Sequence, residues 1–263
     1  MDCWADSHLH SRHSFDSTAP MEDQCRAALA QGLSELCFTE HFSLDSQVPT
    51  YGYMDWAGYR AEFEACRRAF SPQLALFWGV EVCEPHHLAG DYEALFGRLP
   101  LDAVIGSVHN VAHQKLRRLV QERGPDRASA LYFQEVLAMV ETGRMEIVAH
   151  LDLIKRYIGA PLTSEQLEAN RPVLERILCR MVEKGLALEI NTSTLQKLGE
   201  AMPSPWLLRL YWELGGRKIT FGSDAHQPQR VGDGLEWAFS LAREVGFSGF
   251  YTCRERELCY HAF

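Results

Sequence analysis

Two pairs of potential metal ligands lie near opposite ends of the sequence, and one residue separates the members of each pair. The first pair is His8 and His10, and the second is Asp224 and His226. Side chains on an extended segment alternate in direction with a period of two, so both members of a pair can point the same way. Imidazole and carboxylate groups together suit Zn²⁺, Mn²⁺ or Fe²⁺. The pairs therefore favour an open, catalytic site for divalent metal ions.

Such ligands need a scaffold that brings distant residues together, and the hydropathy pattern indicates one. Short apolar runs alternate with longer amphipathic stretches, which is typical of βα units around a parallel sheet. The predicted strands cover residues 3–7, 35–39, 75–82, 102–108, 145–149, 186–190, 217–221 and 249–252. Helices with clear start and stop signals cover 21–31, 164–184 and 203–214. No linker interrupts the pattern, so we expect one barrel and a single domain over residues 1–263.

Ligand-type side chains follow most of these strands at their carboxyl ends. They are His8, His10, Glu40, His41, Glu81, His109, His150, Asp224 and His226. In a barrel of parallel strands these ends converge on one face, where active sites are built. Either pair alone could arise by chance in a chain with eleven histidines, but an ordered series over six strand ends is an improbable coincidence. We therefore predict a metal centre at that face.

Composition excludes several classes of protein. The net charge of −9 argues against binding to long nucleic acids or anionic membranes, which require positive surface. The longest apolar runs, such as 74–80, are shorter than the roughly 18 residues of a membrane-spanning helix. Eight irregularly spaced cysteines without a C-x-x-C motif indicate reduced thiols rather than a disulfide framework. With no secretory signal recognised, we expect a cytoplasmic protein that acts on a small molecule, as a monomer or a homodimer.

The ordered motifs resemble those of the polymerase and histidinol phosphatase (PHP) superfamily. The matching segments, between residues 6 and 226, are DSHLHSRHSFDS, LCFTEH, GVEV, IGSVH, IVAHLDLIKRY, LEIN and FGSDAH. Within the superfamily, MEDQCRAALAQGLSELCFTEH and AHLDLIKRY look most like the monofunctional histidinol-phosphate phosphatases. The resemblance implies a distorted seven-stranded (β/α) barrel of the TIM-like type. It also implies that the strand at 249–252 lies outside the barrel.

The same resemblance implies two to three divalent metals, Zn, Mn or Fe, and a ligand set for each. One metal would be held by His8, His10, Glu81 and Asp224; a second by the shared Glu81 with His109 and His150; a third by Asp16, His41 and His226. At the position of Asp16 many family members carry a histidine. His13 lies three residues too early for that position, and we interpret it as a loop residue.

The implied reaction is hydrolysis of L-histidinol phosphate to L-histidinol and phosphate in histidine biosynthesis, by attack of a metal-bridging hydroxide. Glu81, Asp224, His226 and Arg156 would be the catalytic residues. For substrate contacts we predict Arg156, Lys155 and Arg117 at the phosphate, with Arg118 a similar candidate to Arg117. Asp45, in the irregular segment 42–54, would bind the substrate amine.

Other polar residues have expected supporting roles or none. Glu189, Asn191 and Asp152 could orient ligands from behind. The remaining histidines are interpreted as surface or loop residues: His86, His87, His113 and His261.

Three alternatives stay open at this point. A PHP-type phosphoesterase could act on nucleotides, oligonucleotide ends or other small phosphate esters. An amidohydrolase-like barrel also carries H-x-H after its first strand, but it would usually need a bridging lysine where this chain has Glu81. A metal-binding module without turnover is disfavoured by the complete ligand set, because loss of catalysis usually leaves gaps. Metal content and sensitivity to chelators separate these classes.

Overall fold

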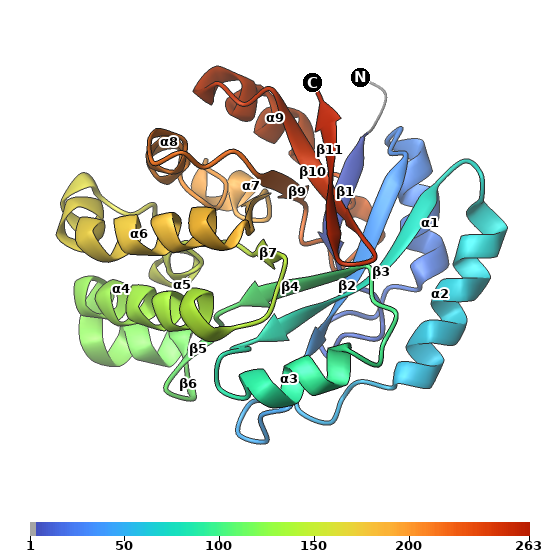
Figure 1. The fold of residues 1–263 in the computed structure, drawn as a ribbon, viewed down its shortest axis with the longest axis horizontal. Coiled ribbons are helices and arrows are strands. Elements are labelled where there is room, and N and C mark those ends of the chain that lie inside the picture. The colour runs from blue at the N-terminus through green and yellow to red at the C-terminus, as the bar shows by residue number, and fades with distance from the viewer. Residues whose placement is uncertain (1–3) are drawn as a thin grey trace.

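A parallel seven-stranded sheet forms the centre of the molecule (Figure 1). The computed structural model describes residues 4–263, so residue 3 of the first predicted strand lies outside the described part. The strands pair in the order β1-β2-β3-β4-β7-β8-β9. Their bounds are β1 (Ala5–Leu9), β2 (Glu35–Phe42), β3 (Ala75–Cys83), β4 (Ala103–Ser107), β7 (Ile147–Val148), β8 (Ala187–Asn191) and β9 (Ile219–Gly222). The predicted seven-stranded (β/α) barrel is confirmed.

The barrel closes where the end of β1 meets the residues that follow β9. The amide of Asp224 donates to the carbonyl of His8, and the amide of His10 donates to the carbonyl of Ala225, each at 2.8 Å. Below this seam the buried Asp6 carboxylate accepts from the amide of Ser223 at 2.9 Å. Closure therefore sets the two ligand pairs, separated by more than 200 residues in sequence, side by side.

Helices lie around the outside of the sheet (Figure 1). Their bounds are α1 (Met21–Ala30), α2 (Trp56–Phe70), α3 (Ala89–Phe96), α4 (Leu116–Thr142), α5 (Ile154–Ile158), α6 (Ser164–Lys184), α7 (Leu195–Leu198), α8 (Pro205–Glu213) and α9 (Leu235–Val245). Local signals explain the predicted ones. Thr163 and Gln166 form a capping box at the start of α6, and Gly185 ends it in the left-handed conformation.

The predicted strand at 249–252 belongs to a C-terminal hairpin and not to the barrel. Strands β10 (Gly249–Arg254) and β11 (Glu257–Ala262) pair only with each other, antiparallel. Cys253 of this hairpin packs against buried side chains from the first halves of the barrel strands, among them Cys37 and Ala103. Arg254 pairs with Glu35 at the start of β2. The hairpin thus covers the amino-terminal mouth of the barrel and leaves the opposite mouth for chemistry.

Two connections at the carboxyl-terminal mouth are important for the site. Residues 43–55, between β2 and α2, are irregular, and they nearly coincide with the predicted irregular segment 42–54. After β4 the chain makes a small hairpin that was not predicted, β5 (Asn110–Val111) and β6 (Gln114–Lys115). Within residues 4–263, no helix combines the length and the apolar character that spanning a bilayer requires.

Candidate metal centre

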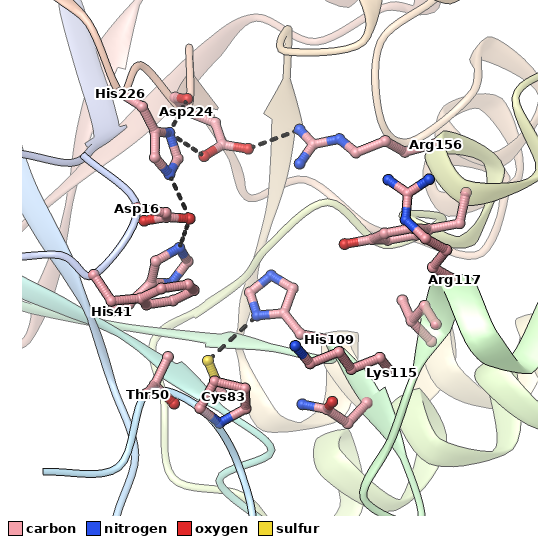
Figure 2. Close-up of a pocket in the computed structure, with 15 residues that line it drawn as sticks. Asp16, His41, Thr50, Cys83, His109, Lys115, Arg117, Arg156, Asp224 and His226 are labelled. Carbon is pink, nitrogen blue, oxygen red and sulfur yellow. Dashed lines mark hydrogen bonds and ion pairs between the residues drawn. The ribbon is translucent and has the colours of Figure 1, made fainter. Parts of the chain in front are cut away.

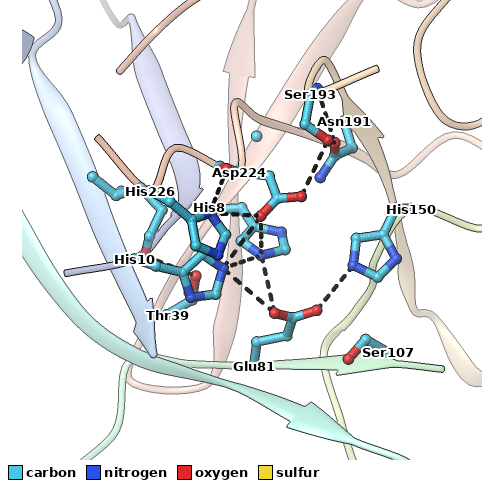
Figure 3. Close-up of polar contacts among 12 residues, drawn as sticks. His8, His10, Thr39, Glu81, Ser107, His150, Asn191, Ser193, Asp224 and His226 are labelled. Carbon is cyan, nitrogen blue, oxygen red and sulfur yellow. Dashed lines mark hydrogen bonds and ion pairs between the residues drawn. The ribbon is translucent and has the colours of Figure 1, made fainter. Parts of the chain in front are cut away.

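The carboxyl-terminal mouth brings together all nine predicted metal ligands, six of which Figure 3 labels. Each is within 4 Å of at least one other member. We call this set the nine-residue cluster: His8, His10, Asp16, His41, Glu81, His109, His150, Asp224 and His226. It mixes imidazoles with carboxylates from the carboxyl-terminal ends of β1, β2, β3, β4, β7 and β9 and the residues that follow them. The strand-end prediction is therefore confirmed as a spatial arrangement.

Glu81 lies at the centre of the cluster and is fully buried. Its Oε2 is 3.4 Å from the Nε2 atoms of both His8 and His10. Its Oε1 is 2.9 Å from His150 Nε2 (Figure 3). The same oxygen is 3.5 Å from His109 Nε2. Burial alone would raise the pKa of Glu81, but the surrounding imidazoles outweigh it and hold the pKa well below its usual value. A carboxylate that uses both oxygens in this way is suited to bridge two metal ions.

Asp224 occupies a second central position, at the seam of the barrel. Its Oδ1 lies 3.4 Å from His10 Nε2, while its Oδ2 accepts from Arg156 at 3.0 Å and from Ser193 at 3.1 Å. The backbone of Asp224 is left-handed, with φ 55°, and that of His150 has φ 24°. Such conformations are costly for residues other than glycine and are common at functional sites. Here they turn both side chains into the cluster.

Asp16 and not His13 belongs to the cluster. The Asp16 Oδ2 is 3.4 Å from His41 Nε2 and 3.2 Å from His226 Nε2 (Figure 2). His13 instead contacts Glu62 at 2.7 Å. Partial burial acts to raise the pKa of Asp16, but the two imidazoles outweigh it and lower that pKa. The geometry therefore places Asp16 among the cluster imidazoles and His13 outside them, and binding of metal by Asp16 stays a prediction.

Unpaired buried atoms show that the cluster fits metal ions. Glu81 Oε2 and His41 Nδ1 are 2.8 Å apart, yet neither atom has a hydrogen-bond partner among the described residues. His8 Nε2 and His10 Nε2 face each other at 3.0 Å, while His8 Nδ1 contacts the Glu189 carboxylate at 2.6 Å. Ring nitrogens and carboxylate oxygens that converge in this way, some of them without a hydrogen-bond partner, are expected where ligands surround a cation. The donor set suits Zn²⁺, Mn²⁺ or Fe²⁺.

Residues behind the ligands fix their orientation. Glu189, predicted for this role, holds His8 through one oxygen and accepts from the His150 amide through the other at 2.8 Å. Ser14 contacts His10 Nδ1 at 3.0 Å, and its hydroxyl donates to the buried Glu40 at 2.6 Å. The serine was not predicted, because a serine in a polar segment carries no distinctive signal.

Asp152, also predicted to orient an imidazole, does not do so. Its Oδ2 accepts from the amide of Ser204 at 3.0 Å and lies 3.0 Å from Lys155 Nζ. Asn191 contacts no ligand directly but accepts from the Ser193 hydroxyl at 2.6 Å, and that serine contacts Asp224. The predicted supporting roles are therefore confirmed in part.

A cavity of about 390 Å³ opens over the cluster (Figure 2). Five of the cluster residues line its floor: Asp16, His41, His109, Asp224 and His226. Three cationic side chains line it as well, Lys115, Arg117 and Arg156. Phe15 and Tyr157 supply aromatic rings. Arg156 and Arg117 thus lie where the sequence predicted, whereas Lys115 was missed because nothing distinguished it from other lysines.

Lys155 does not reach this cavity, and that prediction was wrong. Its side chain is fully buried, with Nζ 2.7 Å from Glu200 and 3.0 Å from Asp152. Successive side chains on a helix point about 100° apart, so Lys155 faces inward when Arg156 faces the cavity. Arg118 is also directed elsewhere, since it is exposed and pairs with Glu122 at 2.6 Å.

Asp45 was also placed wrongly. It is 7% exposed and does not line the cavity. Its Oδ2 is 3.3 Å from His87 Nδ1 and 3.1 Å from His113 Nδ1. His87 and His113 lie in loops, as the sequence interpretation expected, but their contacts with Asp45 were not predicted. Of the two carboxylates that line the cavity, Asp16 and Asp224, the more exposed is Asp16.

Comparison with known proteins agrees with this geometry. A PHP domain model matches residues 6–193. A probable histidinol-phosphatase of Thermotoga maritima is 30% identical over 92% of each chain, and the histidinol-phosphatase of Lactococcus lactis is 28% identical over 94% of this chain and 93% of its own. The crystal structure of the L. lactis histidinol phosphate phosphatase with zinc, L-histidinol and phosphate has a TM-score of 0.86 at 26% identity, covering 97% of this chain and 98% of that one. The chain belongs to the PHP family.

Proposed function

We propose that this protein is a histidinol-phosphatase, which hydrolyses L-histidinol phosphate to L-histidinol and inorganic phosphate in histidine biosynthesis. The observation that carries the proposal is the cavity, which combines a floor of metal-type ligands with three cationic side chains. Similarity over nearly the whole length to a phosphatase whose structure holds zinc, L-histidinol and phosphate supports the choice of substrate.

The nine-residue cluster would hold two to three divalent metals, Zn, Mn or Fe. His8, His10, Glu81 and Asp224 form one ligand group, Glu81, His109 and His150 a second, and Asp16, His41 and His226 a third. When bound, such ions lower the pKa of water toward neutrality and neutralise phosphoryl oxygens. Burial, together with the neighbouring His150 and His41, lowers the pKa of His109 to about 3, although Glu81 opposes it. This imidazole is therefore neutral at pH 7 and keeps a lone pair for coordination.

Arg156 binds the phosphate in this proposal. Burial acts to lower its pKa, but the Asp224 carboxylate outweighs it and keeps the guanidinium charged. The contact with Asp224 at 3.0 Å fixes one arm of the planar group, and the other arm is free to donate to a phosphoryl oxygen. Lys115 and Arg117 add positive charge on the cavity wall. The substrate dianion thus meets cations on more than one side.

The remainder of the cavity suits the histidinol group. Phe15 and Tyr157 offer aromatic faces against which an imidazole can stack. The Asp16 carboxylate stays ionised because its pKa is low, and its side chain is 37% exposed. It can attract the substrate amine while it contacts His41 and His226. Arg156 and Asp16 therefore act on opposite ends of the ligand.

The test is phosphate release from L-histidinol phosphate compared with sugar phosphates, nucleoside monophosphates and short DNA. We expect kcat/KM for histidinol phosphate to exceed that for every other substrate by more than about tenfold. A tenfold ratio corresponds to about 1.4 kcal/mol of transition-state free energy. Glu81→Gln is the control, and it should abolish release from every substrate. If a nucleotide were preferred, or if no substrate were preferred over the others, the assignment to histidinol phosphate would be rejected. The protein would then be a PHP-type phosphoesterase of another specificity.

A further inference from the structure

A second group of ligand-type side chains lies outside the nine-residue cluster. Asp45 comes from the segment between β2 and α2, His87 from the segment between β3 and α3, and His113 from the turn between β5 and β6. One ligand atom from each lies within 4.8 Å of the other two. We call these three residues the rim cluster. Three separate connections at the same mouth of the barrel thus contribute two imidazoles and one carboxylate.

The spacing of the donor atoms fits a single first-row divalent ion. With metal–ligand bonds of about 2.0–2.2 Å, neighbouring donors around one ion are about 2.8–3.6 Å apart, depending on the coordination geometry. Asp45 Oδ2 is 3.1 Å from His113 Nδ1. The distance from Asp45 Oδ2 to His87 Nδ1 is 3.3 Å. The carboxylate is 7% exposed, so water cannot fully solvate its charge.

A carboxylate behind His87 orients it as a ligand. Glu135 Oε1, from α4, is 2.9 Å from His87 Nε2. When Nε2 donates its proton to Glu135, the lone pair on Nδ1 points toward Asp45. Glu189 holds His8 of the nine-residue cluster in the same way, at 2.6 Å. This carboxylate–histidine pairing is the usual arrangement behind metal-bound imidazoles.

The rim cluster is accessible and adjoins the cavity. The side chain of His113 is 37% exposed, and it lines a surface hollow with Gln114 and Lys115. Pro49 and Thr50, a few residues after Asp45, line the main cavity, as do Asn110 and Lys115 on the hairpin that carries His113. An ion at the rim cluster would therefore connect two segments that form the cavity wall.

We propose that Asp45, His87 and His113 bind a further divalent cation of the Zn²⁺ class, which fastens the 42–54 segment to the β5–β6 hairpin. Two nitrogen donors and one oxygen donor suit Zn²⁺, and solvent completes the coordination. The site is separate from the proposed function, because none of its ligands belongs to the nine-residue cluster.

The experiment is the zinc content at equilibrium with saturating buffered zinc, measured for wild type and three variants. Asp45→Asn keeps the oxygen that accepts from the Gln47 amide at 2.9 Å but removes the charge. His113→Asn suits the left-handed backbone at this position, φ 62°. The matched control is His261→Gln, which removes a histidine from the C-terminal hairpin. Thermal melts identify any variant that does not fold.

We expect Asp45→Asn and His113→Asn each to bind about one zinc fewer than wild type, and His261→Gln to bind as many. Equal zinc content in all folded proteins would overturn the proposal. Because the readout is a difference between variants, it does not depend on how many ions the nine-residue cluster holds. Hydrolysis of histidinol phosphate is not part of the readout, so the proposed function can fail without affecting this result.

Discussion

Replacing Arg156 by alanine should lower kcat/KM for histidinol phosphate by about 10- to 30-fold. A hydrogen bond to a charged group contributes about 1.5–3 kcal/mol. The Arg156 side chain is one-third exposed, at 33%, so the lower part of this range applies. A loss of about 1.5–2 kcal/mol in transition-state binding lowers kcat/KM by about 10- to 30-fold, since 1.4 kcal/mol corresponds to about a tenfold change in rate. Asp224 also loses its contact at 3.0 Å.

The assay is steady-state phosphate release, with the metal content of each protein measured in parallel. Arg156→Ala should retain wild-type metal content, because the guanidinium is not a ligand, and Arg156→Lys should recover part of the activity through its charge. Arg118→Ala is the matched control, since Arg118 is exposed and pairs with Glu122 alone at 2.6 Å. If Arg156→Ala with full metal lost less than about threefold in kcat/KM, its assignment to the phosphate would be refuted.

Three further predictions concern the metal bridge, a buried acid and a corrected residue. Glu81→Gln should lower the metal content by at least about one equivalent, because Glu81 faces both ligand groups; unchanged content by elemental analysis would contradict the bridge. Burial raises the pKa of Glu84 to about 7 although hydrogen bonds from neighbouring amides oppose it. Its folded pKa lies above the unfolded value, so the acid destabilises the fold progressively as pH rises from about 4.5 to 7. In urea unfolding, the free energy of unfolding of Glu84→Gln minus that of wild type should therefore increase by about 1–3 kcal/mol from pH 5 to pH 8. A difference that stayed the same over this pH range would reject the prediction. Lys155→Met should reduce the free energy of unfolding by about 3–5 kcal/mol, because it leaves the buried Asp152 carboxylate without its cation. The protein that remains folded should keep the wild-type KM. A large rise in KM would place Lys155 at the substrate.

The sequence was sufficient to predict a barrel and most of the side chains that meet at its carboxyl-terminal mouth, because both follow simple periodicities; that these side chains bind metal stays a prediction. Strand ends of a parallel barrel meet on one face, so His8, Glu81 and Asp224 could be grouped without knowledge of any contact. The strand at 249–252 lies outside the barrel, as the family resemblance implied, but its antiparallel partner was not predicted. It turns into β11 at Glu255 and Arg256, which adopt positive φ values without the glycine or asparagine that usually marks such a turn.

Contacts that depend on loop conformation could not be predicted in the same way. Asp45 was assigned to the substrate amine from its place in the irregular segment after the His41 strand, and only the folded segment shows it beside His87 and His113. Lys155 and Arg156 are neighbours in sequence, and the choice between them depends on the rotation of α5. The extent of the domain over residues 1–263, the oligomeric state and the cellular location stay predictions.

The most direct test of the central claim is zinc titration of metal-stripped protein with phosphate release from L-histidinol phosphate as the readout. The nine-residue cluster predicts negligible phosphate release without metal. The rate of release should rise with bound zinc and saturate at about two to three ions per chain, not counting an ion at the rim cluster. Stripped protein that released phosphate as fast as the zinc-loaded protein would contradict a metal-dependent phosphatase.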